Sequence, residues 1–263
     1  VVMAPSSIED CFYSVITARK IAETFNMVVV ILSDSALATA QTQFPRPQFA
    51  EEWQAPPIDQ SPVPAGSKPY DWDEFTGLFQ RVLPGQPGGM HTITGLAHDR
   101  NSRVAYDPAT NEEGLRHRSL KLAALQRTLT TPEVFGEPEG DLLLVGWGST
   151  RGAIEESVTR LAAEGYRVSS LHLTFIQPMP SGIGEILRRF RRVMTIENNW
   201  SDQLGDDIID HENRRYSALA WMLRARHLVD VDCWSESRGR PIKPSAICSE
   251  VRGRLEKARG NKA

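Results

Sequence analysis

The sequence predicts an α/β protein built on a parallel β-sheet, and residues 141–199 carry most of that prediction. Apolar runs of strand length, such as LLLVGW and RVMTIE, alternate there with segments of helical periodicity, such as TRGAIEESVTRLAAEG. A strand, a crossover helix and a second strand form a βαβ unit, which gives parallel strands with helices on the faces of the sheet. We therefore expect a ligand site at the carboxyl ends of these strands.

Polar residues follow the predicted strands along that edge of the sheet. The candidate site residues are Ser149, Thr150, Gln177, Glu197, Asn198 and Asn199. Ser149 and Thr150 are expected to cap the following helix, whose free N–H groups can also receive an anion. Glu197, Asn198 and Asn199 stand at the end of the predicted strand RVMTIE. They can bind a ligand, or they can simply satisfy backbone groups at the strand end.

The chain starts with a predicted strand, VVMAP, and a helix with a strong start signal. Ser6 or Ser7 can cap this helix, with Glu9 or Asp10 close behind. Its expected apolar face consists of Ile8, Phe12, Ile16, Ile21 and Phe25. Because the first residues already lie inside an apolar run, we expect the chain to be the carboxyl-terminal part of a longer polypeptide.

The run MVVVILSD comes next and predicts a fully buried strand that ends at Ser33 and Asp34. Together with the preceding strand and helix it completes a βαβ unit, so residues 1–38 are expected to be the end of an α/β domain.

Residues 39–138 are predicted to be a connecting region, because Pro and Gly recur in FPRPQ, APPIDQSPVPAGSKPYD and LPGQPGG. One short helix is expected near residues 115–127. The aromatic side chains between Trp53 and Phe79 are too apolar for a free linker, so we expect them to pack against another domain or subunit. Residues 139–233 form the main α/β domain, and residues 234–263 form a tail with a short helix that starts at Pro244 or Ser245.

Composition is that of an ordinary globular protein, with 24% charged residues and a formal net charge of -3. This balance disfavours nucleic acid as a partner, and no apolar run approaches the roughly 20 residues that span a bilayer. Cys11, Cys233 and Cys248 are far apart, so no disulfide framework or local iron–sulfur site is expected. A reducing, cytoplasmic compartment fits this cysteine usage.

Two motifs suggest cofactors but fit simpler interpretations. Gly146, Gly148 and Gly152 resemble a dinucleotide fingerprint, yet their spacing is one residue too long, so a tight turn with close helix packing is favoured. His91 and His98, with Asp99, match no standard metal-ligand spacing, and no metal site is predicted. No local signature of a catalytic nucleophile is present either.

The series EDCFYSVITARKIAE, VVVILSDSALA, TGLAHD, LLLVGWGSTRGAI, LHLTFIQPMP, IENNWSDQL and GRPIKPSAI resembles the alpha subunit of 2-oxoacid:ferredoxin oxidoreductases, specifically the 2-oxoglutarate type. The motifs keep their order over nearly the whole chain. The resemblance implies that residues 1–38 end a pyrimidine-binding domain for thiamine diphosphate. It also implies that residues 139–233 are similar to the carboxyl-terminal domain of transketolases.

The resemblance further implies oxidative decarboxylation of a 2-oxoacid with coenzyme A and ferredoxin. Thiamine diphosphate and magnesium would lie at a site shared with a beta subunit that carries an iron–sulfur cluster, in a heterodimer or a dimer of heterodimers. In the family, a Tyr-Pro-Ile-Thr-Pro motif, an acidic residue and an Arg-Gly-Gly segment activate the cofactor and hold the substrate carboxylate. None of them is present in this sequence, so no catalytic residue is assigned. Ala97 also replaces the Glu that usually precedes His-Asp in the family.

Two alternatives stay open at this point. One is the beta component of a thiamine-dependent 2-oxoacid dehydrogenase, which shares the architecture but passes its acyl group to a lipoyl arm. The other is a noncatalytic interaction module. The long Pro-rich connection and the IENNWSDQL and GRPIKP segments favour the ferredoxin-linked family.

Overall fold

The computed structural model describes residues 1–54, 57–203 and 205–260, which divide into two compact units. The first unit contains Val1–Val2, Val15–Val30 and Pro45–Leu129. The second contains Met3–Ser14, Ile31–Phe44 and the described residues from Thr130 onward. None of the helices in the described ranges is long and apolar enough to cross a membrane.

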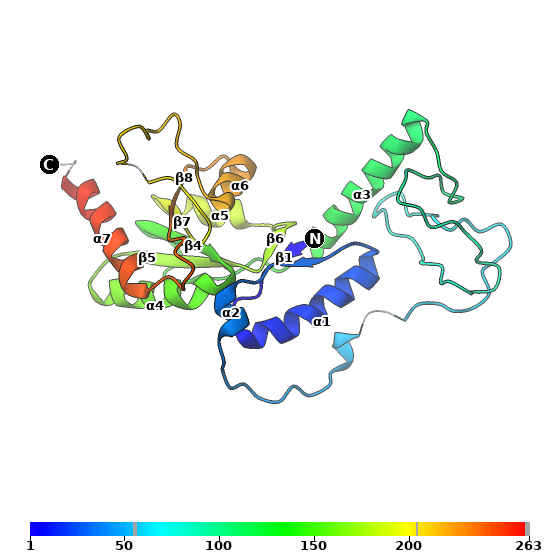
Figure 1. The fold of residues 1–263 in the computed structure, drawn as a ribbon, viewed down its shortest axis with the longest axis horizontal. Helices are drawn as coiled ribbons and strands as arrows, with labels where there is room; N and C mark the ends of the chain where they lie inside the picture. Colours follow the sequence, from blue (N-terminus) through cyan, green and yellow to red (C-terminus); the bar gives the residue numbers. More distant parts are fainter. Residues whose placement is uncertain (55–56, 204, 261–263) are drawn as a thin grey trace. The chain divides into compact units, whose positions relative to one another are not determined.

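The second unit is built on a five-stranded sheet with the order β3-β5-β4-β7-β8 (Figure 1). The strands are β3 (Val134–Phe135), β4 (Leu142–Trp147), β5 (Val168–Leu173), β7 (Val193–Glu197) and β8 (Val231–Ser235). The last four pair in parallel, and only β3 at the edge pairs antiparallel. The predicted α/β fold with a parallel sheet is therefore confirmed. The continuous apolar sequence of β4 reflects burial on both faces of the sheet.

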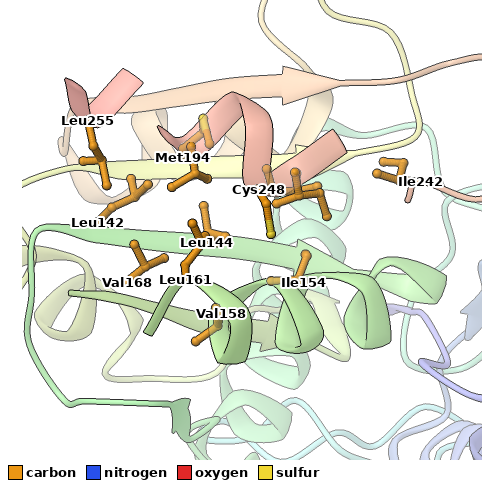
Figure 2. Packing of buried hydrophobic residues seen from close by; sticks show 13 residues of the cluster. Leu142, Leu144, Ile154, Val158, Leu161, Val168, Met194, Ile242, Cys248 and Leu255 are labelled. Carbon is orange, nitrogen blue, oxygen red and sulfur yellow. The ribbon is translucent and has the colours of Figure 1, made fainter. Parts of the chain in front are cut away.

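One face of this sheet is covered by α4 (Arg151–Ala163) and α7 (Pro244–Gly260). Figure 2 shows Ile154, Val158 and Leu161 of α4 gathered with the apolar side chains of β4 and β7. The carboxyl-terminal helix starts at Pro244 as predicted, and it packs against the sheet. Ile247, Cys248, Val251 and Leu255 give α7 a buried stripe with helical spacing, and that stripe joins the core.

The opposite face of the sheet meets α6 (Ala218–His227). Alternate residues of β7 point to opposite faces, so Thr195 and Glu197 lie on the face away from α4. Thr195 Oγ1 lies 3.1 Å from the Oγ of Ser217, the residue that precedes α6. The short helix α5 (Ile183–Arg188) is buried through Ile183, Ile186 and Leu187.

Two predicted strands differ from the structure. Strand β5 ends at Leu173. Residues 175–177 form a separate strand, β6 (Phe175–Gln177), which belongs to a three-stranded sheet of order β2-β1-β6. In that sheet the run MVVVILSD contributes only β2 (Val30–Ile31), which lies at the edge beside β1 (Val2–Met3). Val28 and Val30 are exposed, so the prediction of a fully buried strand was wrong.

Helix α1 (Ile8–Phe25) starts with the predicted cap. Ser7 Oγ accepts the backbone N–H of Asp10 at 3.0 Å, and the Asp10 carboxylate accepts the N–H of Ser6 at 2.7 Å. The buried positions of the helix are Ser14, Ala18 and Ile21, whereas Phe12 of the predicted apolar face is exposed. A short helix, α2 (Ser35–Thr39), follows β2.

The first unit is organised around α3 (Pro108–Thr128), which is longer than the predicted helix at residues 115–127. Its start is set by Asp107, whose carboxylate accepts the N–H of Thr110 at 2.9 Å, with Pro108 at the first helical position. Trp72 is buried against this helix, 4.5 Å from the ring of His117. The unit also contains residues 15–25 of α1 and the 3-10 helix η1 (Glu51–Trp53), and the rest of it is mainly irregular chain.

Candidate functional site

The parallel pairing of β4 and β7 brings most of the predicted site residues to one edge of the sheet. Val145 lies beside Thr195 in the register, and two residues further on the Trp147 indole donates from Nε1 to Glu197 Oε2 at 3.2 Å. Ser149 follows one strand and Asn198 follows the other. Both side chains donate to the same carboxylate oxygen, Oδ2 of Asp34, and the Asn198 bond measures 2.9 Å.

Asp34 is the residue that sequence reasoning missed. Its Oδ1 caps α2 by accepting the N–H groups of Ala36 at 3.0 Å and Leu37 at 3.2 Å, while Oδ2 receives Ser149 and Asn198. Partial burial raises the pKa of the Asp34 carboxyl, but these four hydrogen bonds outweigh burial and hold it below its ordinary value. Asp34 is therefore an ionised acceptor with no spare role as a proton carrier near neutral pH.

Glu197 is fully buried, with no exposed surface. Its two oxygens accept from Trp147 Nε1, Asn199 Nδ2 at 2.9 Å and Ser217 Oγ, and also from the first N–H groups of α6. A carboxylate is stabilised at a helix amino terminus because the free N–H groups and the helix dipole favour negative charge. Of the two interpretations left open for this strand end, the local hydrogen bonds favour the structural one.

The remaining predicted residues have separate outcomes. Thr150 is buried, and its Oγ1 donates to the carbonyl oxygen of Trp147 at 2.8 Å. Neither Ser149 nor Thr150 caps α4 through its side chain, so that expectation was wrong: both hydroxyls are directed to acceptors outside the helix. Gln177 is exposed at the end of β6 and takes no part in the hydrogen bonds to Asp34 or Glu197 among the described residues.

We call the set formed by Asp34, Trp147, Ser149, Glu197 and Asn198 the strand-end junction. It joins α2, the ends of β4 and β7, and the start of α6 within the second unit. Its carboxylates are saturated with donors, which is how buried charges are made tolerable. The arrangement can fix the loops at the carboxyl edge of the sheet, whereas general acid–base catalysis would need a carboxylate free to exchange a proton.

The predicted glycine turn is present after β4, and Gly146 and Gly148 have different roles in it. A Cβ atom at Gly146 would lie 2.3 Å from Ile154 Cδ1 and 2.8 Å from Thr150 Oγ1, so close packing of strand and helix occurs there. Gly148 has a φ of +62°, which glycine adopts without strain, but the space around its Cβ position is open. The expected close helix packing therefore occurs at Gly146, and the positive φ of Gly148 fits the expected tight turn.

We expect Gly148→Val to destabilise the second unit by about 1 to 3 kcal/mol, because a β-branched residue is strained at positive φ. Urea denaturation of the chain followed by circular dichroism measures this loss. Gly152→Ala is the matched control, since Gly152 lies in α4 in open space and without positive φ. Alanine there should be neutral or stabilise by up to about 1 kcal/mol. An unchanged unfolding midpoint for Gly148→Val would show that the turn does not need glycine.

We expect Asp34→Asn to lower the free energy of unfolding at pH 7 by about 1 to 2 kcal/mol. An amide has a single acceptor oxygen, whereas both carboxylate oxygens of Asp34 accept hydrogen bonds. The folded pKa of Asp34 is lowered, so its stabilisation is present above the ordinary pKa and is lost as pH falls through the folded value. The difference between wild type and variant should therefore shrink in acid. Thermal unfolding between pH 7 and pH 2 measures it, with the exposed Asp207→Asn as control.

The histidines considered for metal binding are engaged in local loop contacts. His91 Nδ1 lies 2.8 Å from the carbonyl oxygen of Gly89, and His98 Nδ1 lies 3.1 Å from that of Leu96. The carboxylate of Asp99 accepts backbone N–H groups in its own turn. These local bonds supply a structural role for each of the three residues.

Sequence reasoning also missed a group in the first unit that combines Glu74, Glu113 and His117, whose ligand atoms lie within 4.8 Å of one another. The carboxylates are already paired: Arg100 binds both, and Arg116 lies 3.0 Å from Glu74. Two guanidinium groups at the carboxylates oppose the approach of a metal cation. The only sequence signal was the spacing of four residues between Glu113 and His117 on one helix face.

No family model matches the chain. Its fold is shared over 96% of its length with 2-oxoglutarate:ferredoxin oxidoreductase from Magnetococcus marinus, solved with 2-oxoglutarate, coenzyme A and succinyl-CoA bound. The TM-score is 0.81 at 26% identity, and the match covers 41% of that chain. The parallel α/β architecture of this chain is therefore shared with part of that polypeptide.

Sequence relatives identify the family. The chain is 33% identical over 260 residues to 2-oxoglutarate oxidoreductase subunit KorA of Mycobacterium tuberculosis, a match covering 97% of this chain and 36% of the relative. It is 30% identical over 211 residues to 2-oxoacid:ferredoxin oxidoreductase 1, subunit alpha, of Aeropyrum pernix, covering 74% of this chain and 31% of the relative. The chain belongs to the alpha subunits of 2-oxoacid:ferredoxin oxidoreductases, and it spans about a third of the length of these curated relatives.

Proposed function

We propose that this chain is part of the alpha subunit of an enzyme that oxidatively decarboxylates 2-oxoglutarate, transfers the acyl group to coenzyme A and passes electrons to ferredoxin. The observation that carries the proposal is the 33% identity over 97% of the chain to a 2-oxoglutarate oxidoreductase subunit. The Magnetococcus marinus structure supports the same substrate and acyl acceptor, since it contains 2-oxoglutarate, coenzyme A and succinyl-CoA.

Within that enzyme we assign the described residues a scaffold and interface role. The polar side chains at the carboxyl edge of the sheet bind one another, as Asp34 and Glu197 illustrate, and this supports a structural junction. We also propose the division inferred from the sequence. Residues 1–38 end a pyrimidine-binding domain, residues 39–138 connect, residues 139–233 are similar to the carboxyl-terminal domain of transketolases, and residues 234–263 follow it.

The metal-bound diphosphate of thiamine diphosphate, the cofactor that the family implies, does not fit the described residues. This diphosphate is bound through a divalent cation, which needs free oxygen ligands. The group in the described residues whose spacing suits a cation, Glu74, Glu113 and His117, has both carboxylates paired with arginine. We therefore propose that the cofactor and magnesium are held outside these residues, at a site shared with the partner subunit.

Partner and compartment follow from the same proposal. We propose a beta subunit that carries the iron–sulfur cluster and docks ferredoxin, in a heterodimer or dimer of heterodimers. Cys233 and Cys248 are buried in the core of the second unit, and Cys11 is a further free thiol, so these cysteines are not arranged as cluster ligands. Free thiols fit a reducing cytoplasm.

The decisive experiment is an assay of the alpha polypeptide with its partner subunit, using 2-oxoglutarate or pyruvate with coenzyme A and ferredoxin. We expect succinyl-CoA formation and ferredoxin reduction, with kcat/KM higher for 2-oxoglutarate. A preference for pyruvate would contradict the proposed substrate. Activity that requires a lipoyl acceptor in place of ferredoxin would contradict the whole assignment and favour a 2-oxoacid dehydrogenase.

We further expect residues 1–263 alone neither to bind thiamine diphosphate tightly nor to decarboxylate a 2-oxoacid. Calorimetric titration of the isolated chain with thiamine diphosphate and magnesium measures this. The assembled complex serves as the positive control. Binding by the isolated chain at about micromolar Kd, near −8 kcal/mol, would place a complete cofactor site within these residues and overturn the expectation.

A further inference from the structure

The first unit contains a cavity of about 240 Å³ beside α3 that no part of the proposed function uses. The aromatic rings of Tyr70, Trp72 and Phe79 line it. Ligand sites for drug-sized molecules have volumes of about 300 to 1,000 Å³, so this cavity suits a smaller molecule with a single ring. Aromatic walls bind flat apolar bodies through stacked and edge-to-face contacts.

Lys121 brings a buried positive charge to the same cavity. Its side chain is on α3 in a residue only 9% exposed, and Nζ donates to the backbone oxygen of Asn26 at 2.9 Å. The ammonium also lies 5.2 Å from the Phe79 ring centroid. In the described part of the chain no carboxylate forms an ion pair with it. A buried charge without a counterion is costly, so a bound anion would be stabilised here.

Other groups around the cavity favour an anion as well. Arg118 lines it, and the lining residues include no Asp or Glu. Burial, reinforced by the charge of Arg118, lowers the pKa of Lys121 below its ordinary value, because both disfavour the charged form of the lysine. The ammonium has three N–H donors, and the contact with Asn26 uses one of them.

Two residues that line the cavity, Trp72 and His117, have buried polar atoms without a hydrogen-bond partner among the described residues. The Nε1 of Trp72 and both ring nitrogens of His117 are buried without a hydrogen-bond partner among the described residues. Trp72 is 8% exposed and His117 is 3% exposed. The carboxylates near His117 lie 3.7 Å and 4.0 Å from its Nε2, too far for hydrogen bonds, and are held by Arg100 and Arg116. Buried polar atoms of this kind normally have a hydrogen-bond partner, so two residues that line the cavity keep polar atoms that the described residues do not satisfy.

We propose that this cavity binds a small aromatic carboxylate, with its ring between the aromatic side chains and its carboxylate at Lys121. A carboxylate supplies the counter-charge and the acceptor atoms that the cavity lacks. A single flat ring matches the aromatic walls and the volume. All the residues that line the cavity belong to the first unit, and binding there does not depend on the proposed enzyme activity.

Calorimetric titration of the protein in its assembled complex tests the proposal, with benzoate as the probe. We expect saturable binding with one site per alpha chain and a Kd below about 1 mM, which corresponds to about −4 kcal/mol. Benzyl alcohol keeps the ring without the charge, and acetate keeps the charge without the ring. Both should bind at least about tenfold more weakly, because each lacks one of the two recognised features.

Three variants separate this site from any other benzoate site in the complex. Lys121→Met keeps the apolar stem and removes the charge, and should weaken benzoate at least about tenfold. Lys20→Met is its matched control, since Lys20 also donates to a backbone oxygen, that of Glu52, but does not line the cavity. Its affinity should equal that of wild type. Ala97→Glu places a carboxylate in the cavity wall. It should abolish benzoate binding, because the new carboxylate would form an ion pair with Lys121.

Two results would overturn the proposed benzoate site. No heat of binding up to about 10 mM benzoate would end the proposal, since that corresponds to a negligible affinity. So would binding that Lys121→Met and Ala97→Glu leave unchanged, because the ligand would then lie elsewhere. Circular dichroism of each variant in parallel shows whether it is folded, and if Lys121→Met is unfolded, Ala97→Glu alone decides the outcome.

Discussion

Glu197→Ala should lower the free energy of unfolding of the second unit by about 3 to 5 kcal/mol, because it leaves several buried hydrogen-bond donors without an acceptor. In the wild type the carboxylate receives the Trp147 indole, the Ser217 hydroxyl and the first N–H groups of α6. Alanine offers none of these an acceptor, and the site has no exposed surface through which bulk water can replace it. Urea denaturation of the chain, monitored by circular dichroism, measures the loss.

Two variants serve as controls for Glu197→Ala. Glu197→Gln keeps the shape and one acceptor oxygen but turns an NH₂ group toward donors, because both carboxylate oxygens accept in the wild type. It should therefore lie between wild type and alanine. Glu156→Ala removes an exposed carboxylate that pairs with Arg160 and should stay within about 0.5 kcal/mol of wild type. A loss for Glu197→Ala as small as this would mean that the junction does not stabilise the fold.

The sheet was predictable from sequence because its strands are buried on both faces. Such strands appear as continuous apolar runs, as in residues 142–147 and 193–197, and the intervening helix keeps its own periodicity. The same rule failed for MVVVILSD, which is equally apolar but contributes only a short edge strand, β2. Apolar composition alone does not reveal how many neighbours a strand has.

The candidate site was only partly predictable, because its contacts are distant in sequence. Ser149 and Asn198 were found from their place after strands, yet their shared acceptor, Asp34, lies 115 and 164 positions away. Sequence periodicity reports faces of helices and strands, not which loops meet. The pairing of Arg100 with Glu74 and Glu113 in the first unit was hidden for the same reason.

Trp72 and Phe75 were predicted together to pack against another domain or subunit, and the structure separates them. Trp72 is buried inside the first unit, 4.5 Å from the His117 ring and 5.1 Å from the Arg100 guanidinium. We expect Trp72→Ser to destabilise this unit by about 3 to 5 kcal/mol through loss of a buried aromatic side chain. Hydrogen exchange should increase over α3 and leave residues 141–233 unchanged. Equal protection of α3 in wild type and variant would contradict this role.

Phe75 is 89% exposed, so its side chain is available for the predicted contact with another domain or subunit. Phe75→Ser should leave the stability of the first unit within about 0.5 kcal/mol of wild type while weakening assembly with the partner subunit. Analytical ultracentrifugation of the two subunits measures that affinity. Tyr106→Ser is the matched control, because Tyr106 has the same exposure in the same unit and carries no predicted contact. Equal assembly of wild type and Phe75→Ser, or rapid proteolysis of the complex around Trp72, would show that this segment does not dock.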